Sequence, residues 1–342
     1  METRTAAAAA VLLFFPVKFV LKKEEETEMG GKKQKQHAQK SLWKRMQSGW
    51  QVYLLLLIPV IYLIIFCYVP MGGLVLAFKK YDISRGIWGS PWVGFANFIK
   101  FFKSYKFTVV LKNTLVLAIY SLIVGFPIPI LFALLLNAFP GRRYKKAVQT
   151  ITYIPHFIST VVMVGIIVQI LNNRTGIYGS LYSFFTGQTA PDILSKGNLF
   201  KHIFVWSGIW QSTGYNAIIY IASLSNVDQS LHEAACIDGA SRFQRLRYVD
   251  WPCIRPTAVI MLILAAGGIM NVSFEKALLM QNDLNIAYSE VISTYVYKVG
   301  LQSGIGDFSL STAIGMFNSV INFILLVIVN AISKRLTDNS IF

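Results

Sequence analysis

The sequence predicts an all-α polytopic membrane protein with six transmembrane helices and both termini in the cytoplasm. Of its 342 residues, 54% are hydrophobic and only 14% are charged, and the mean hydropathy is +0.52. Such values are typical of membrane proteins and exclude an ordinary soluble domain. Long apolar stretches alternate with short basic segments, and this alternation predicts both the spans and their orientation.

Six stretches with few or no charges are long enough to cross a bilayer, which needs ~20 apolar residues in a helix. They lie within residues 51–78, 113–141, 147–173, 203–227, 256–274 and 308–333. The first is long enough to extend beyond the membrane or to break near Pro70, Gly72 and Gly73. Glu275 and Lys276 interrupt the end of the fifth, where a local ion pair is the simplest explanation for them.

The net charge of +16 is concentrated at alternate membrane ends. Basic residues cluster before the first span, at 142–146, at 242–255 and at 334–335. By the positive-inside rule these segments face the cytoplasm, so both termini and the polar loop at 230–252 lie inside. The first outer loop is also basic, but its segment FANFIKFFKSYKF predicts an amphipathic helix on the membrane surface. The distribution indicates contact with membrane lipids and argues against nucleic acid as a partner.

Residues 1–48 are expected to form a polar cytoplasmic tail. The apolar run AAAAAVLLFF covers only about half of a span and is followed by Pro16 and Lys18, so it predicts neither a signal peptide nor a seventh helix. A translation start at Met29 is an alternative interpretation, which mass analysis of the native N-terminus would test.

Motifs for catalysis are missing from the sequence. It has no phosphate-binding G-x-x-x-x-G-K-[ST] loop, no G-x-S-x-G nucleophile turn and no HExxH zinc motif. Cys67, Cys236 and Cys253 show no metal-ligand spacing. We therefore expect that this chain is not an enzyme and binds no metal or cofactor.

One histidine, His156, lies well inside the third predicted span, directly after Pro155. A histidine at membrane depth is a candidate functional residue. A structural role is favoured, because the ring can hydrogen-bond carbonyls that a helix break at the proline leaves free.

The polar loop at 230–252 reads SLHEAACIDGASRFQRLRYVDWP and contains two helix-start signals. Ser230 with Glu233, and Ser241 with Gln244, each match a capping box. In this motif the hydroxyl and the acid or amide three residues later satisfy two backbone N–H groups. The loop is therefore predicted to hold two short helices.

Gly239 stands between these two helices and can adopt the left-handed conformation that ends a helix. Pro252 is expected to stop the second helix. We interpret the loop as a helix–glycine–helix projection that is presented to a partner.

The same loop resembles the EAA loop of ABC importer permeases with type I transmembrane domains. The family pattern is EAA, three residues, G, nine residues and I-x-L-P. This chain matches it in register at Glu233, Ala234, Ala235, Gly239 and Pro252. Val249 replaces isoleucine conservatively, whereas Trp251 departs from the usual leucine. The extension EAACIDGAS, with Asp238 before the glycine and Ser241 after it, is most similar to the carbohydrate-importing branch.

The resemblance covers most of residues 52–336. The segments YVPMGGLVLAFKKYD, LKNTL, YIPHFIS, GIWQSTGYNAIIYIASL and TYVYKVGL are similar to polysaccharide- or lipoprotein-type sugar permeases. This resemblance implies that the chain is a permease subunit of a saccharide importer in the plasma membrane of a bacterium. The implied partners are a second, non-identical permease subunit, a cytoplasmic ABC ATPase dimer that hydrolyses ATP, and an extracytoplasmic solute-binding protein or lipoprotein. An ABC importer for a non-sugar solute and a secondary transporter are the alternatives.

In that family the EAA loop couples the spans to the ATPase, which drives alternating access. The coupling residues that the resemblance implies are Ser230, Glu233, Ala234, Ala235, Asp238, Gly239, Ser241, Arg242 and Pro252. Small alanines let the helix enter a groove closely, and the Glu233 carboxylate can pair with a basic group on the ATPase. Arg242 can contact either acidic residues of the ATPase or lipid headgroups.

Polar and aromatic residues of the fourth and fifth spans are candidates for the substrate pathway, because saccharides need hydrogen-bonding groups and aromatic faces. They are Trp210, Gln211, Tyr215, Asn216, Asn271, Ser273, Phe274 and Glu275. Hydrogen bonds between helices and aromatic residues at the membrane interface explain such residues equally well.

Four segments make up the predicted domain organisation. Residues 1–48 form the tail, and 49–108 the first transmembrane helix and the outer loop with its interfacial helix. Residues 109–334 form the ABC type I permease core with the coupling loop, and 335–342 a cytoplasmic tail.

Overall fold

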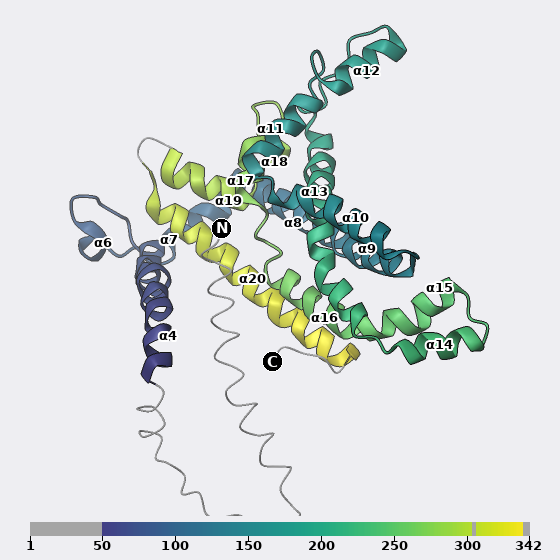
Figure 1. Cartoon of the computed structure of the whole chain (residues 1–342). Helices are drawn as coiled ribbons and strands as arrows, with labels where there is room; N and C mark the ends of the chain where they lie inside the picture. Colours follow the sequence, from purple (N-terminus) through teal and green to yellow (C-terminus); the bar gives the residue numbers. More distant parts are fainter. Residues whose placement is uncertain (1–49, 303–305, 338–342) are drawn as a thin grey trace, which may run out of the picture. The chain divides into compact units, whose positions relative to one another are not determined.

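Residues 50–302 and 306–337 are described by the computed structural model of this protein (Figure 1). Helices joined by loops make up most of this part of the chain. The expected tail at 1–48, with its alternative start at Met29, and the end of the expected tail at 335–342 lie outside the described residues.

The first of two compact units, Met1–Val75, contributes a long apolar helix. It is built from α4 (Trp50–Leu63), η1 (Ile64–Tyr68), α5 (Val69–Met71) and η2 (Gly72–Phe78), which continues into the second unit. Together these segments are long and apolar enough to cross a membrane. The winding tightens to a 3₁₀ helix from Gly72, so the expected irregularity near Pro70 is a change of winding and not a break.

The second unit, Leu76–Phe342, begins with two short helices, α6 (Gly86–Gly89) and α7 (Ala96–Lys103). The predicted amphipathic character of α7 is confirmed, because Phe101 is buried while Lys100 is exposed. Its place on the membrane surface stays a prediction.

The first long helix of this unit is formed by α8 (Tyr105–Gly125) and α9 (Pro127–Ala138), which together could cross a membrane. It begins eight residues before the predicted start at residue 113, since the Ser104 hydroxyl caps the helix by accepting a hydrogen bond from the Lys106 amide. The prediction placed Lys106 in the interfacial segment of the outer loop, but it lies in the first turn of α8 and its ammonium pairs with the buried Glu290 carboxylate.

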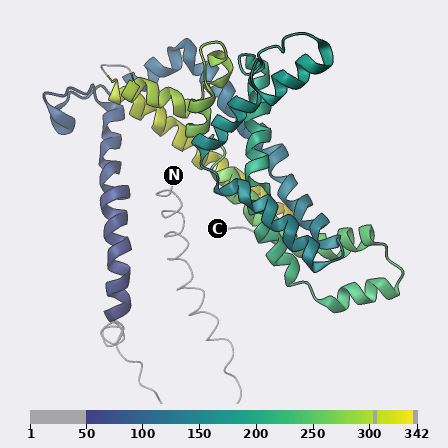
Figure 2. The ribbon, with the colours of Figure 1, turned by 45° about the horizontal axis from the view of Figure 1, so that its top comes forward.

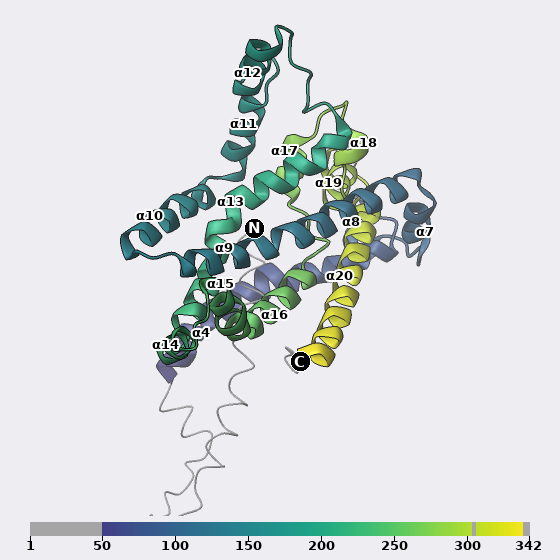
Figure 3. The ribbon, with the colours of Figure 1, turned by 90° about the vertical axis from the view of Figure 1, so that its right-hand side faces the viewer.

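The third predicted span is not one straight helix. It consists of α10 (Arg142–Tyr153), η3 (Ile154–Phe157) and α11 (Thr160–Ile170), and the two long parts are bent by 99°. The helix ends after Pro155, and Ser159 starts the new helix by capping the Val162 amide. Figure 3 shows α11 continuing into α12 (Ile177–Thr186), away from the other long helices of this unit.

The helix α13 (Gly197–Ser225) lies at the centre of the second unit and packs against α8, α9 and α10. A close contact with α10 depends on Gly214, where a Cβ atom would lie 2.3 Å from the Thr152 carbonyl oxygen. Many of its residues are glycine, serine, threonine, glutamine or asparagine, as in the segment GIWQSTGYNA. These small and polar residues make it less apolar than the other long helices.

The remaining helices follow α13 in two groups. First come α14 (Gln229–Ile237), α15 (Arg242–Arg245), η4 (Leu246–Asp250) and α16 (Trp251–Gly267). Then come α17 (Phe274–Met280), α18 (Ile286–Ser289), α19 (Ile292–Tyr297), η5 (Lys298–Gln302) and α20 (Phe308–Thr337). The fifth predicted span, 256–274, therefore starts too late and extends too far, because the helix that carries it ends at Gly267.

The part of the chain that the structure describes holds four helices long and apolar enough to cross a membrane, or five if the bent pair α10–α11 is one span. The fourth predicted span is carried by α13, which does not reach this apolarity, for the compositional reason above. An all-helical membrane protein is thus confirmed, while the count of six spans stays a prediction.

Three hydrophobic clusters hold the described part of the second unit together. The first joins α8, α11, α13 and α17 around Leu117, Met163, Phe204 and Ala277. The second joins α9, α13 and α16 around Leu134, Tyr220 and Ile254. The third joins α7, α8, α19 and α20 around Phe101, Val110, Ile292 and Ile314. Because α13 contributes to two of the clusters, a movement of α13 would change the packing of both.

Candidate functional site: the coupling loop and the face of α13

The polar loop projects from the ends of α13 and α16 as two short antiparallel helical segments (Figure 2). Its first helix, α14, starts two residues earlier than the capping box at Ser230 predicts. The cap is Asp228, whose carboxylate accepts a hydrogen bond from the Ser230 amide at 2.9 Å. This hydrogen bond holds the pKa of Asp228 below its usual value. Ser230 is therefore inside the helix, and the predicted box of Ser230 with Glu233 is wrong.

The end of α14 is closed by Gly239, as predicted. Its φ of +77° is left-handed, a conformation that costs glycine little. The Ala240 amide donates to the Ala235 carbonyl at 2.9 Å, and the Gly239 amide donates to the Cys236 carbonyl at 3.1 Å. This pair of hydrogen bonds is a Schellman motif, which reverses the chain sharply.

The second capping box is confirmed. The Gln244 amide donates to the Ser241 hydroxyl at 3.3 Å, and the Ser241 amide donates to the Gln244 side-chain oxygen at 2.7 Å. A guanidinium N–H of Arg245 reaches back to the Cys236 sulfur at 2.8 Å and links the two helical segments.

The expectation that Pro252 stops the second helix is wrong. The helix runs on from Arg242 to Gly267, with Pro252 in the first turn of α16. The preceding turn, η4, is a π-helix in which the Trp251 amide donates to the Leu246 carbonyl. A wider turn of this kind eases the clash between the proline ring and the preceding turn, so the helix continues through Pro252.

A polar cavity of about 110 Å³ lies where the loop meets α9. It is lined by Asn137, Ala138, His232, Arg242, Arg245 and Asp250. Asp250 is only 3% exposed and accepts from His232 Nε2 at 3.1 Å and from Asn137 Nδ2 at 3.3 Å. These contacts connect both helical segments of the loop to α9. These contacts were not predicted from the sequence, although the carboxylate of Asp250 beside apolar residues in V-D-W-P was a signal for a buried partner.

Large apolar side chains on the loop face outward. Ile237 is 87% exposed, and Phe243 and Tyr248 are each 69% exposed. Glu233 and Ala234 are also exposed. Grouped apolar exposure on a projecting element is typical of a surface that binds another protein.

The predicted pathway residues on α13 lie on different faces of the helix. Gln211 and Tyr215 are four residues apart and share one face. Gln211 Nε2 donates to the Ile158 carbonyl at 2.9 Å, across the break between η3 and α11. The Tyr215 ring stacks on His156 with 3.7 Å between ring centroids. Trp210 points elsewhere and is 53% exposed, and Asn216 is also exposed.

His156 therefore has an aromatic partner on α13, and the carbonyl hydrogen bond expected for it is not among the hydrogen bonds of the described residues. The helix break beside it is confirmed.

The predicted residues after α16 form no single cluster. The Asn271 side-chain oxygen accepts from Asn322 Nδ2 of α20 at 3.2 Å. Phe274 meets the Tyr297 ring edge-on at 5.3 Å, and the Ser273 carbonyl accepts from the amide of Ala277. Glu275 is exposed, and the pair expected between it and Lys276 is replaced by a hydrogen bond from Lys276 to the Phe204 carbonyl.

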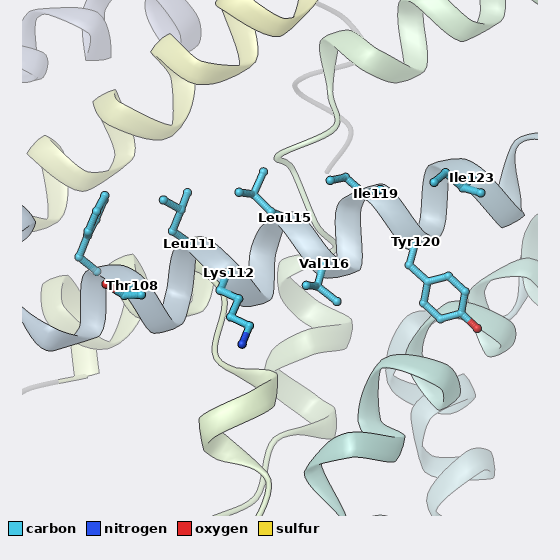
Figure 4. A pocket seen from close by; sticks show the side chains of 9 residues that line it. Thr108, Leu111, Lys112, Leu115, Val116, Ile119, Tyr120 and Ile123 are labelled. Carbon is cyan, nitrogen blue, oxygen red and sulfur yellow. The ribbon is translucent and has the colours of Figure 1, made fainter.

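A groove of about 630 Å³ runs along one face of α8 (Figure 4). It is lined by Phe107, Thr108, Leu111, Lys112, Leu115, Val116, Ile119, Tyr120 and Ile123. Its walls are almost entirely apolar, and none of the predicted site residues lines it. Such a surface suits an apolar neighbour better than a sugar.

The helical membrane domain and its projecting helix–glycine–helix loop agree with those expected of a transport permease, and the comparison with known families shows the same class. Residues 125–338 match the family described as "Binding-protein-dependent transport system inner membrane component", and the chain belongs to this family. The fold agrees, because the chain is similar to a solved "bacterial ABC transporter involved in the import of the acidic polysaccharide alginate". The TM-score is 0.79 at 38% sequence identity, with 86% of this chain and 99% of that chain covered.

Two curated relatives come from Bacillus subtilis (strain 168). The chain is 40% identical to "Protein LplB" over 85% of this chain and 91% of LplB. It is 38% identical to "Polygalacturonan/rhamnogalacturonan transport system permease protein YteP" over 90% of this chain and 95% of YteP.

This chain is thus a multi-pass membrane protein of a bacterial inner-membrane family and the permease component of an ABC importer. ATP hydrolysis takes place on a separate subunit, and the predicted resemblance to sugar permeases is confirmed.

Proposed function

We propose that this permease moves fragments of polysaccharides across the cell membrane and is driven through the loop at 230–252. Of the more similar relatives, those at 36–40% identity, YteP is named for polygalacturonan and rhamnogalacturonan transport and the solved transporter for alginate import. Polygalacturonan and alginate are chains of uronic acids, so oligosaccharides that contain uronic acid are the first cargo to test.

The observation that carries the proposal is the loop itself. It offers exposed apolar side chains at Ile237, Phe243 and Tyr248, next to the exposed Glu233 and Ala234. This surface would dock into the cytoplasmic ABC ATPase dimer. The contacts of Asp250 would carry the resulting displacement to α9, because a buried carboxylate shared by two partners resists sliding.

The remaining partners and the topology belong to the same proposal. A second, non-identical permease subunit would complete the pathway, and an extracytoplasmic solute-binding lipoprotein would deliver the sugar. Six spans would leave both termini inside. Residues 49–108 would form the first transmembrane helix and the outer loop, and residues 109–334 would form the permease core. Of the candidate pathway residues, Gln211 and Tyr215 are the best placed, since both lie on the face of α13 that meets η3 and the start of α11.

Reconstitution tests this function. The permease pair, the ATPase and the binding protein from the same gene neighbourhood are placed in proteoliposomes, and uptake of labelled oligogalacturonides is measured with ATP inside. Uptake should require ATP and should disappear with a hydrolysis-deficient ATPase. Uptake that follows an ion gradient without ATP would instead indicate a secondary transporter.

A further inference from the structure

Lys276 is a buried lysine near the start of α17. Only 4% of the surface of this residue is exposed. The ammonium donates to the Phe204 carbonyl of α13 at 2.6 Å and lies 4.7 Å from the centroid of the Phe204 ring. Among the described residues, no carboxylate lies within 4.0 Å of this ammonium, and the adjacent Glu275 is exposed.

A buried ammonium without an anion is costly. An ammonium group has three N–H donors, and the carbonyl and the ring face offer only partial compensation for the water it has lost. Ionisable side chains in membrane domains are usually retained for a function. The hydrogen bond to a neutral carbonyl can be exchanged for a stronger, charge-assisted one when a carboxylate arrives.

The surroundings of Lys276 continue the polar face of α13. Gly208 provides the space for the ammonium, because a Cβ atom there would lie 3.2 Å from Lys276 Nζ. Gly208, Gln211 and Tyr215 follow each other at a spacing that places them on one side of a helix. Along this side lie the ammonium, the Gln211 amide and the Tyr215–His156 ring stack.

We propose that Lys276 binds the carboxylate of an acidic sugar as it passes along this face of α13. The ammonium would exchange the Phe204 carbonyl for the sugar carboxylate, while the amide and the stacked rings would contact neighbouring hydroxyls and ring faces. The proposal rests on the proposed function as a saccharide importer. It makes Lys276 the residue that selects uronic acids over neutral sugars.

Uptake by the reconstituted transporter tests it with two matched sugars. These are the trimer of galacturonic acid and its fully methyl-esterified form, which has the same chain without the charges. Lys276→Gln should lower uptake of the acidic trimer by about tenfold or more, because a hydrogen bond between two charged groups is lost. Lys276→Arg should stay within about threefold of the wild type, since the charge remains. Lys103→Gln, at an exposed lysine of α7, serves as the matched control and should change neither uptake.

The two sugars also separate binding from structural support. If Lys276 only fastens α17 to α13, Lys276→Gln will lower uptake of both sugars equally, and the proposal is overturned. If the wild type imports only the neutral sugar, the protein is a saccharide importer, but the proposal that Lys276 binds a sugar carboxylate is overturned. Failure of every saccharide would overturn the proposed function itself.

A chemical rescue gives a second test, which does not depend on transport of the methyl-esterified trimer. Lys276→Cys is treated during turnover with aminoethyl methanethiosulfonate, which restores a positive charge, or with methyl methanethiosulfonate, which does not. Uptake of the acidic trimer should recover only with the charged reagent, and excess trimer should slow the modification. Equal effects of both reagents, or no modification, would overturn the proposal. The parent protein, treated in the same way, reports on the native thiols Cys67, Cys236 and Cys253.

Discussion

At the scale of single residues, two side-chain caps and one left-handed glycine define the ends of the two helical segments in the coupling loop. The capping box of Ser241 with Gln244 and the left-handed Gly239 were predictable, since each depends on residues only a few positions apart. The start of α14 was not. Asp228 and Ser230 are both good caps, and only the hydrogen bond between them in the folded loop decides for Asp228.

Asp228→Ala should therefore loosen the first turn of α14 more than Ser230→Ala does. Hydrogen exchange of the α14 amides in the purified complex measures this. The hydrogen bond lowers the pKa of Asp228, so the carboxylate stabilises the folded loop above the pKa of the unfolded chain. The effect is lost as the pH falls through the lowered folded-state pKa. Greater loosening by Ser230→Ala would restore the cap that the sequence suggested.

At the scale of helices, apolar length predicted where the spans lie but not their shape. Pro155 stands inside an apolar run, and a proline permits either a kink or a complete break. The 99° bend follows from the Ser159 cap and from contacts with α13, which a single segment of sequence does not reveal. The buried position of Lys276 was likewise unpredictable, because it depends on the space that Gly208 leaves on another helix.

Gly214→Ala should disturb the packing of α13 on α10. The new methyl group would meet backbone atoms of Thr152 at 2.3 and 2.5 Å, and backbone cannot move aside as a side chain can. The expected cost is about 1–3 kcal/mol, measured as a lower melting temperature of the complex in detergent. Gly165→Ala in α11 is the control, since nothing lies within 4 Å of its Cβ position and the melting temperature should not fall. Equal behaviour of the two variants would contradict the described packing.

At the scale of the whole molecule, the sequence led to the correct family and to an all-helical membrane fold. The EAA loop made this possible, because its long gapped pattern is rarely met by chance. The number of spans was harder to predict from the sequence. Since α13 carries glycine, serine, threonine, glutamine and asparagine between the apolar side chains that it buries, its hydropathy understates its place in a membrane domain.

The proposed orientation can be tested with a thiol reagent that does not cross membranes. In intact cells it should label Gln188→Cys in the exposed segment after α12, because this segment is expected outside. Cys236, on the coupling loop, should react only after the membrane is opened. Labelling of Cys236 in sealed cells would contradict the proposed orientation and place the coupling loop outside.

Coupling through the loop at 230–252 is the central claim, and paired glycine variants test it most directly. Gly239 and Gly187 have φ of +77° and +67°, and no atom lies within 4 Å of either Cβ position. Valine at either site thus brings a similar backbone cost, about 1–2 kcal/mol or more, without a clash. The measurement is ATP-driven saccharide uptake per assembled complex in proteoliposomes. Gly239→Val should assemble but lose at least about tenfold of its uptake, a loss of coupling worth ~1.4 kcal/mol or more, whereas Gly187→Val should transport normally. Normal uptake by Gly239→Val, or the same loss in both variants, would contradict the coupling role.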